Sequence, residues 1–185
     1  MPSALANATL VGADGQAITV SSLWSRRSAL LMFLRHFGCV ACSLQVATLL
    51  DRATELQVLG VDVVLVGSAA PSEIERFVRE EIGDRAVTVL CDPSLDAYRA
   101  AGLHRSFLRT FGPRAALGYL RATARGFSRG GTRGDLLQQA GALLVDARGV
   151  VLWSHRSRAL GDLAELSDMV DVLLPLAAAR SGLGV

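Results

Sequence analysis

The sequence contains no lysine, and all nineteen of its basic residues are arginine. Its net charge is only +2, and it lacks the basic runs with interleaved aromatic residues that nucleic-acid binding favours. It also has no uncharged apolar run of about 18 residues or more, the minimum for a transmembrane helix. We therefore expect neither a nucleic-acid partner nor a membrane partner, and we attribute the arginine bias to coding rather than to function.

The first residues, MPSALANATLVGADGQ, show no signal-peptide pattern. They contain neither a basic segment nor the apolar segment that should follow it. About half of all residues are apolar (51%), which is typical of a compact globular chain. We therefore expect a cytoplasmic protein that forms a single domain over residues 1–185.

Cysteine is scarce as well. The chain contains three: Cys39, Cys42 and Cys91. An odd number this small excludes a disulfide scaffold. A zinc site would need a second ligand pair, but the three histidines are scattered: His36, His104 and His155. We therefore expect no metal and no bound cofactor.

The most informative feature that the sequence does contain is a C-x-x-C turn formed by Cys39 and Cys42. An apolar run, Ala29 to Leu34, precedes the turn, and a helical pattern follows it. The free N–H groups and the positive dipole end at a helix start both stabilise a thiolate. In a reducing compartment such a pair is more often catalytic than structural. We predict that Cys39 and Cys42 are the catalytic residues of a thiol redox protein.

Two basic residues, Arg35 and His36, stand beside this turn and can lower a thiol pKa by placing positive charge nearby. They are the supporting site residues, although alternation along a strand would direct only one of them toward the thiols. Cys91 ends another predicted strand beside Asp92. We interpret Cys91 as a small buried apolar residue, with a third redox thiol as the alternative.

Other conspicuous residues receive no catalytic role. We interpret the arginines around the Gly-rich segment 126–134 as part of a solvated loop, with closure over the site or binding of an anionic substrate such as glutathione as alternatives: Arg125, Arg129 and Arg133. We expect three polar residues to be surface residues or satisfied partners: His104, His155 and Arg156. We expect both tryptophans, Trp24 and Trp153, to pack in or near the core.

Hydrophobic patterning predicts alternating strands and helices. Two β-rich runs around the turn at 13–16 predict an N-terminal hairpin. Continuous apolar runs predict buried strands at 29–34, 61–66 and 87–91, and a turn at 146–149 joins two later strands, 142–145 and 150–154. Helical spacing predicts helices at 42–59, 71–82, 95–101 and 160–179, and a broken one at 106–124 within an insertion at 103–135. This order indicates an α/β fold with a central mixed sheet flanked by helices.

Several segments resemble one family. DGQAITVSSLW is similar to its N-terminal hairpin, CDPSLDAYRAAGL to its D-P turn and short helix, and GDLLQQAGALLVDARGVVLWSHRS to its last hairpin. These segments resemble the peroxiredoxin-like proteins of the AhpC/TSA group, and the RHF-x-C-x-x-C turn is similar to the peroxiredoxin-like-2 type. The resemblance implies a thioredoxin-like fold and a thiol oxidoreductase that reduces a peroxide or a disulfide through a Cys39/Cys42 dithiol–disulfide cycle.

The resemblance leaves the attacking thiol open. Peroxiredoxins carry P-x-x-x-T-x-x-C, which places their Pro at Arg35, their Thr at Cys39 and their attacking Cys at Cys42. Thioredoxins instead use the first thiol, Cys39, as the more exposed attacker. The late peroxiredoxin Arg aligns near Ala140, and the thioredoxin cis-Pro is missing from Gln139-Ala140-Gly141. These departures favour general thiol–disulfide chemistry over fast peroxide reduction.

The same resemblance implies the partners. They are a peroxide or disulfide substrate and an external thiol donor, such as thioredoxin or a low-molecular-weight thiol, and the resemblance also admits a homodimer. The missing Pro, Thr and Arg motivate an alternative, a redox-sensing or catalytically silent module that binds a partner protein. A reductase for an organic endoperoxide or hydroperoxide is a third hypothesis.

Overall fold

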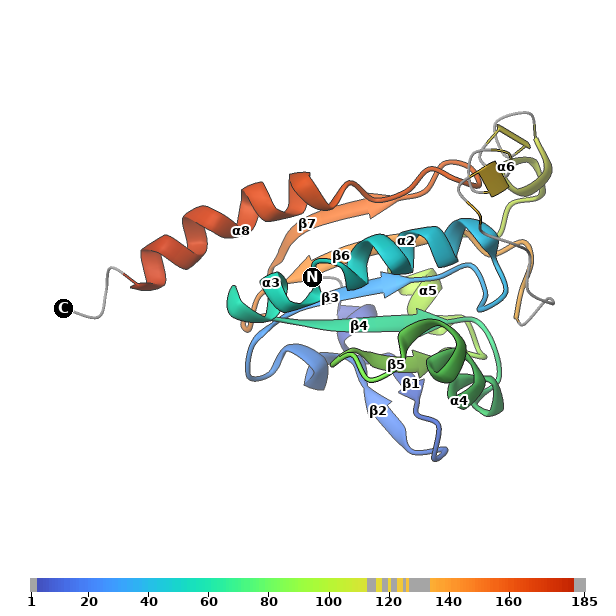
Figure 1. Ribbon diagram of the computed structural model, residues 1–185. Helices are drawn as coiled ribbons and strands as arrows, with labels where there is room; N and C mark the ends of the chain where they lie inside the picture. Colours follow the sequence, from blue (N-terminus) through green and yellow to red (C-terminus); the bar gives the residue numbers. More distant parts are fainter. Residues whose placement is uncertain are drawn as a thin grey trace.

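The computed structural model describes residues 3–112, 116, 117, 120, 123, 124, 126 and 134–181, with the side chains of all of these except 109 and 176–181. Within this part of the chain, strands form one mixed sheet in the order β2-β1-β5-β4-β3-β6-β7 (Figure 1). The strands are β1 (Thr9–Val11), β2 (Ala17–Thr19), β3 (Ser28–Phe33), β4 (Val61–Gly67), β5 (Thr88–Cys91), β6 (Gly141–Val145) and β7 (Val151–Arg156).

Helices lie on both faces of this sheet. The α-helices are α1 (Ser3–Ala6), α2 (Val40–Leu50), α3 (Ala53–Val58), α4 (Ile74–Phe77), α5 (Asp96–Ala100), α6 (Phe107–Phe111) and α8 (Leu166–Ser181). Shorter turns are η1 (Val20–Trp24) and η2 (Pro71–Glu73), both 3-10 helices, and the π-helical η3 (Val78–Ile82). Among the described residues, no helix has both the length and the apolar character needed to cross a membrane.

The centre of the sheet is parallel and its edges are antiparallel. Strands β3, β4 and β5 run parallel, whereas β1 and β2 on one side and β6 and β7 on the other pair antiparallel. Every residue of β3 is buried, as a central strand covered on both faces requires. The predicted α/β architecture, with its N-terminal hairpin and a central mixed sheet between helices, is confirmed.

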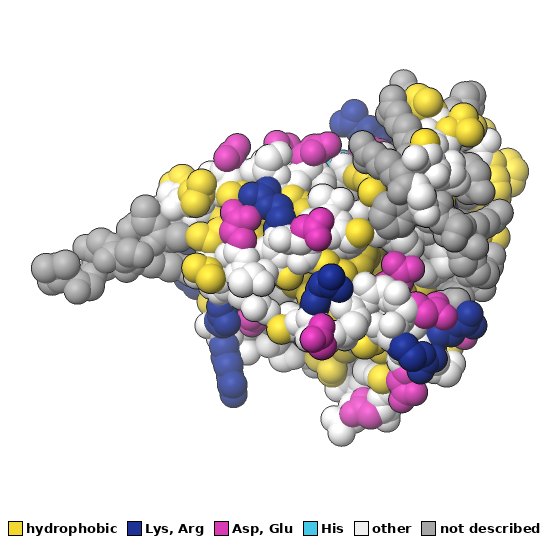
Figure 2. All heavy atoms as spheres, viewed as in Figure 1, with side chains coloured by type: hydrophobic (Ala, Val, Ile, Leu, Met, Phe, Trp, Pro, Cys, Tyr) yellow, Lys and Arg dark blue, Asp and Glu magenta, His cyan; other side chains and the backbone are white. Residues whose placement is uncertain are grey.

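Two layers of apolar side chains form the core. On one face, residues of α2, α4 and α8 pack with Leu30, Met32 and Leu65 of the sheet. On the other face, residues of α1, η1 and α5 pack with Leu31 and Phe33. Because successive strand residues point to opposite faces, the unbroken apolar run of β3 supplies both layers. Arg and acidic side chains are interspersed over the face shown in Figure 2.

The predicted helix 42–59 is two helices in the structure, and the first of them begins earlier than predicted. Helix α2 begins at Val40, so Cys39 is its N-cap residue and Cys42 lies in its first turn. The chain leaves the helix at Arg52 (φ −111°, ψ 2°) before α3 begins. The apolar spacing continues on one face across this break, so periodicity does not reveal it. Gly60, with φ +78°, follows α3 as predicted.

The predicted closing helix also begins later than expected. Helix α8 starts at Leu166, and residues 160–165 form a loop that lies against α2. Gly161 has φ +82°, which a helix excludes, and Asp162 Oδ2 accepts the Arg158 N–H at 2.7 Å. Gln45 holds the loop by two hydrogen bonds to the backbone of Ala164, at 2.7 and 3.2 Å.

Two further predictions differ or fall partly outside the described residues. The predicted helix 71–82 is divided among η2, α4 and η3. Of the predicted broken helix 106–124, α6 is described over Phe107–Phe111, while Pro113 and much of the rest lie outside the described residues. The Gly-rich segment 126–134 is described only at its two ends.

Candidate redox site

The C-x-x-C turn connects the end of β3 to the start of α2. The Cys39 N–H donates to His36 O at 3.1 Å, which closes the turn, and Cys39 O accepts the first helical bond from Ser43 N–H at 3.0 Å. The Cys39 backbone is extended (φ −83°, ψ 117°), as an N-cap residue requires. The fold therefore places Cys39 at the positive end of the helix dipole.

Both thiols are buried, and they face different cavities. Cys39 is 4% and Cys42 5% exposed, so Cys39 is not the more exposed thiol that the thioredoxin analogy implies. Cys39 lines a pocket of about 460 Å³ together with Arg35 and His36. Cys42 instead lines a cavity of about 30 Å³ between α2 and the sheet. The cavity that each thiol faces, rather than its exposure, distinguishes the two.

The environment shifts the pKa values of the two thiols in opposite directions. The hydrogen bond from the Cys42 thiol lowers the pKa of Cys39 to about 7, against the effect of burial, and the charge of Arg35 and the N–H groups of Cys42 and Ala41 act in the same direction. The same hydrogen bond to Cys39 raises the pKa of Cys42 well above its usual range, and burial and the charge on Cys39 raise it further. Cys39 is therefore the more acidic thiol, and Cys42 stays protonated near neutral pH.

Arg35 links the thiols to the distant segments that form the pocket wall. Its backbone N–H donates to Cys42 Sγ at 3.3 Å. Its Nη2 donates to Thr110 Oγ1 of α6 at 2.8 Å and to Leu136 O at 2.7 Å. The residue is 3% exposed, and its Nε and Nη1 have no hydrogen-bond partner within the described part of the chain. The pocket that Cys39 lines is thus bordered by a buried cation.

His36 also lines this pocket. It is buried, and its Nδ1 accepts the Gly38 N–H at 3.3 Å. The expectation that only one of Arg35 and His36 lies toward the site is wrong. Strand β3 ends at Phe33, so strand alternation no longer applies two and three residues later.

The remaining wall of the larger pocket is mainly apolar. Its lining residues come from α2, from α6 and the residues after it, and from the loops around 136 and 160: Val40, Thr110, Phe111, Ala116, Leu120, Leu136 and Leu160. A pocket of this size and character accommodates an organic group. The site therefore combines a thiol of lowered pKa, a buried cation and apolar walls.

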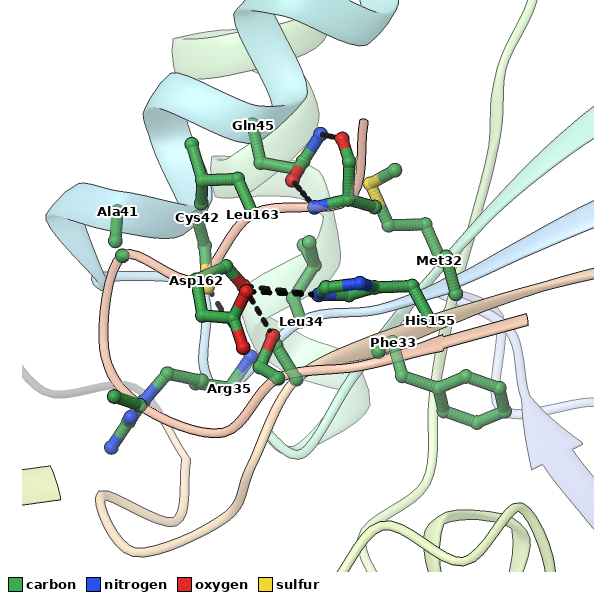
Figure 3. Close-up of a pocket in the computed structure, with 17 residues that line it drawn as sticks. Met32, Phe33, Leu34, Arg35, Ala41, Cys42, Gln45, His155, Asp162 and Leu163 are labelled. Atoms are coloured by element: carbon green, nitrogen blue, oxygen red, sulfur yellow. Dashed lines mark hydrogen bonds and ion pairs between the residues drawn. The ribbon is translucent and has the colours of Figure 1, made fainter. Parts of the chain in front are cut away.

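The smaller cavity shares Arg35 with the larger pocket and is otherwise lined by different residues. Figure 3 shows Cys42, Gln45, His155 and Asp162 around it, while the Arg35 guanidinium extends away from Asp162. His155 Nε2 lies 3.2 Å from Asp162 O and 3.6 Å from Asp162 Oδ1. Loop 160–165 and strand β7 thus bring two titratable side chains to the cavity that Cys42 faces.

Several residues that the sequence did not single out hold the turn in place. The Tyr98 hydroxyl, fully buried, donates to the carbonyls of Leu34 and Val66, where β3 and β4 end. Ser68 Oγ donates to Arg35 O at 2.6 Å. Tyr98 belongs to a segment noted for its family resemblance, but no sequence signal indicates its hydroxyl contacts.

The other described candidates are not among the residues that line the large pocket. Cys91 is fully buried, as expected of a small apolar residue, and burial and the Asp92 charge raise its pKa to about 12. Trp24 is buried and Trp153 half-buried, as predicted; His104 and Arg156 are exposed. Arg125, Arg129 and Arg133 lie outside the described residues. Within the described part, no cluster of three or more His, Cys, Asp or Glu side chains that could hold a metal ion is present.

The sheet topology and the strand–turn–helix site define a class, the thioredoxin-like fold, and a solved structure supports it. The crystal structure of peroxidoxin BcpB from Mycobacterium tuberculosis superposes with a TM-score of 0.63, at 16% identity and over 92% of each chain. The profile of the AhpC/TSA antioxidant enzyme family matches residues 48–159. The chain belongs to this family, as the sequence resemblance predicted.

Named relatives extend the similarity. A prostamide/prostaglandin F synthase from Pongo abelii is 33% identical over 167 residues, which cover 86% of this chain and 81% of that protein. The thioredoxin-like protein AAED1, chloroplastic, from Arabidopsis thaliana is 32% identical over 113 residues, 61% of this chain but only 45% of the plant protein. At this coarse level a redox enzyme of the thiol oxidoreductase type is confirmed. The family match begins after Cys42, so the roles of both thiols are proposals.

Proposed function

We propose that the protein is a thiol peroxidase in which Cys39 attacks an organic peroxide and Cys42 resolves the product. The observation that carries this proposal is that Cys39, and not Cys42, lines the large pocket and has a pKa lowered to about 7. An attacking thiol must be a thiolate and must meet its substrate. A buried Cys42 with a raised pKa suits the second step.

The cycle balances with an external thiol as the reductant. The Cys39 thiolate attacks one oxygen of the peroxide, an S–O bond forms, the O–O bond breaks, and the leaving alkoxide takes a proton to become an alcohol. Cys42 then attacks the sulfenic sulfur of Cys39, an S–S bond forms, and water leaves. Two thiols of a donor reduce the disulfide and restore the pair.

Arg35 is the group that stabilises the leaving oxygen in this proposal. Negative charge develops there as the O–O bond breaks, and preorganised donors in a water-poor site stabilise such charge strongly. Arg35 lines the pocket together with Cys39, and its buried Nε and Nη1 have no hydrogen-bond partner within the described residues, so its charge can act on the pocket. Arg35 would thus replace the arginine that peroxiredoxins carry near position 140, where this chain has Ala140.

The apolar wall supports an organic peroxide rather than hydrogen peroxide as the substrate. Burial of apolar surface contributes about 25 cal/mol per Å², a term that hydrogen peroxide cannot use. One named relative is a prostamide/prostaglandin F synthase, whose name concerns a lipid product. We therefore expect a higher kcat/KM for cumene hydroperoxide than for hydrogen peroxide.

Mass spectrometry after one equivalent of cumene hydroperoxide tests the assignment of roles. Wild type should lose the mass of two hydrogens, Cys42→Ser should gain one oxygen at Cys39, and Cys39→Ser should remain unchanged. Cys91→Ser is the matched control and should behave as wild type. Oxygen gained at Cys42 in Cys39→Ser, with no reaction at Cys39 in Cys42→Ser, would reverse the roles. No catalytic peroxide consumption with dithiothreitol by any of these proteins would instead favour the redox-sensing or silent module.

A further inference from the structure

In the proposed mechanism Cys42 must lose its proton, and the large pocket does not supply the acceptor. Cys42 is 5% exposed, stays protonated near neutral pH, and must lose its proton before its sulfur can attack Cys39. It does not line the pocket through which a substrate would arrive. It lines the small cavity instead. The volume of this cavity, about 30 Å³, is enough for one water molecule.

Titratable or charged groups from several elements surround Cys42: Cys39, Arg35, Tyr98, His155 and Asp162. Cys39 is the sulfur under attack in the resolving step, and a guanidinium accepts no proton. The Tyr98 hydroxyl is fully buried and already donates to two carbonyls. His155 and Asp162 are therefore the acceptors that remain.

These two side chains also reach solvent. Their exposed fractions are 23% for His155 and 35% for Asp162, while both line the cavity that Cys42 lines. Figure 3 shows the two side chains side by side at that cavity, with His155 from β7 and Asp162 from loop 160–165. The Gln45 bonds to Ala164 fix the loop against α2, the helix that carries Cys42. The pair thus lies between the cavity that Cys42 lines and bulk water.

We infer that His155 and Asp162, through water in the small cavity, form the proton path between the Cys42 thiol and solvent. This inference rests on the proposed role of Cys42 as the resolving thiol. In that step the Cys42 S–H bond breaks and the proton passes by water to His155 or Asp162. The Cys42 sulfur forms the S–S bond with Cys39, and the group bound to Cys39 leaves with the electron pair.

Ellman's reagent isolates the step without any peroxide. Cys39 attacks the reagent and releases one thionitrobenzoate at a rate proportional to reagent concentration. Cys42 then attacks the Cys39 adduct and releases a second one at a rate independent of that concentration. Stopped-flow absorbance separates the two phases, and Cys42→Ser, which should lose the second, identifies it.

The informative variants are Asp162→Asn and His155→Gln, with Asp168→Asn on the exposed side of α8 as the matched control. Asparagine keeps the main-chain carbonyl that contacts His155 and Ser157 but accepts no proton at neutral pH. General-base transfer contributes about 10²–10⁴-fold, and each variant leaves the other acceptor in place, so the second phase should slow by roughly ten- to a hundred-fold near pH 7. The first phase should not change, and the deficit should shrink as hydroxide replaces the relay at higher pH.

Three outcomes would overturn the inference. In the first, both variants keep the wild-type rate and pH profile of the second phase. In the second, a variant slows both phases equally, as a structural fault would. In the third, wild type shows no second phase. Failure of the proposed function looks different. In that case the protein consumes no peroxide, yet the second phase is present and sensitive to Asp162→Asn.

Discussion

The Arg35 backbone N–H donates to Cys42 Sγ at 3.3 Å, while the Arg35 side chain reaches into the separate pocket that Cys39 lines. One residue therefore contacts Cys42 through its backbone and the environment of Cys39 through its charge. Arg35 occupies the position where peroxiredoxins carry a proline, which has no N–H to donate. The departure from the family motif thus adds a hydrogen bond to Cys42 that a proline at this position could not make.

The thiol of Cys42 should control the acidity of Cys39. Its hydrogen bond is the largest cause of the lowered Cys39 pKa, so Cys42→Ala should raise that pKa, whereas Cys42→Ser retains an O–H donor and should raise it less. The thiolate is the reactive form, and its fraction grows with pH, so wild-type alkylation should increase through about pH 7. Iodoacetamide alkylation across pH, read by mass spectrometry, gives the midpoints. Equal midpoints for the alanine and serine variants would contradict the hydrogen-bond account.

The Arg35 charge should matter for reactivity more than for stability. Arg35→Met removes the cation near Cys39, so the Cys39 pKa should increase and alkylation near pH 7 should slow roughly tenfold, whereas Arg35→Lys keeps the charge and should slow it less. Replacing a buried, partly unpartnered charge by an apolar side chain is often neutral, so we expect Arg35→Met to change the free energy of unfolding by only about 1 kcal/mol. Alkylation profiles and urea unfolding measure the two effects. An unchanged alkylation profile in Arg35→Met would show that the Arg35 charge does not affect the reactivity of Cys39.

The sequence predicted the sheet and the thiol pair because both depend on local patterns. The apolar runs of β3 and β4 and the C-x-x-C spacing are readable within short windows. The contacts that distinguish Cys39 from Cys42 are not local. Thr110 and Leu136 are 75 and 101 residues away from Arg35, and no periodicity reports such contacts.

Loop 160–165 shows the same limit of prediction from local patterns, because here such a pattern predicted helical residues where the structure has a loop. Its apolar residues fit a helical pattern, so the sequence predicted a helix from 160. The positive φ of Gly161 and the two bonds from Gln45, 119 residues away, instead hold an irregular loop. That loop places Asp162 at the Cys42 cavity, so tertiary contacts that override local propensity build part of the candidate site.

The absence of a side chain at Gly67 should be essential to the turn. A Cβ there would overlap the ring of Phe37, which stacks on Phe77 with ring centroids 4.3 Å apart. Gly67→Ala should therefore destabilise the protein by about 1–3 kcal/mol, because it forces Phe37 out of its place in the turn. Urea unfolding of Gly67→Ala, Phe37→Leu and the double variant forms a cycle. If the alanine costs as much without the Phe37 ring as with it, the overlap is not the cause.

Gln45 should hold loop 160–165 through both the oxygen and the nitrogen of its side-chain amide. Replacing it by Glu should therefore make the stability of the protein depend on pH. Its Oε1 accepts the Ala164 N–H at 2.7 Å and its Nε2 donates to Ala164 O at 3.2 Å. In Gln45→Glu a protonated carboxyl can make both bonds, but an ionised one sets a negative charge against Ala164 O and is buried. The folded state should therefore raise the pKa of the new carboxyl above its unfolded value of about 4.3. The variant should match wild type below that pH and lose stability as pH rises through the folded-state pKa.

Gln45→Met, which has no titratable group, is the control and should lose about 1–3 kcal/mol at every pH. Urea unfolding from pH 4 to 8 measures both variants, and a stability difference between Gln45→Glu and wild type that does not grow with pH would show that the amide does not clamp Ala164.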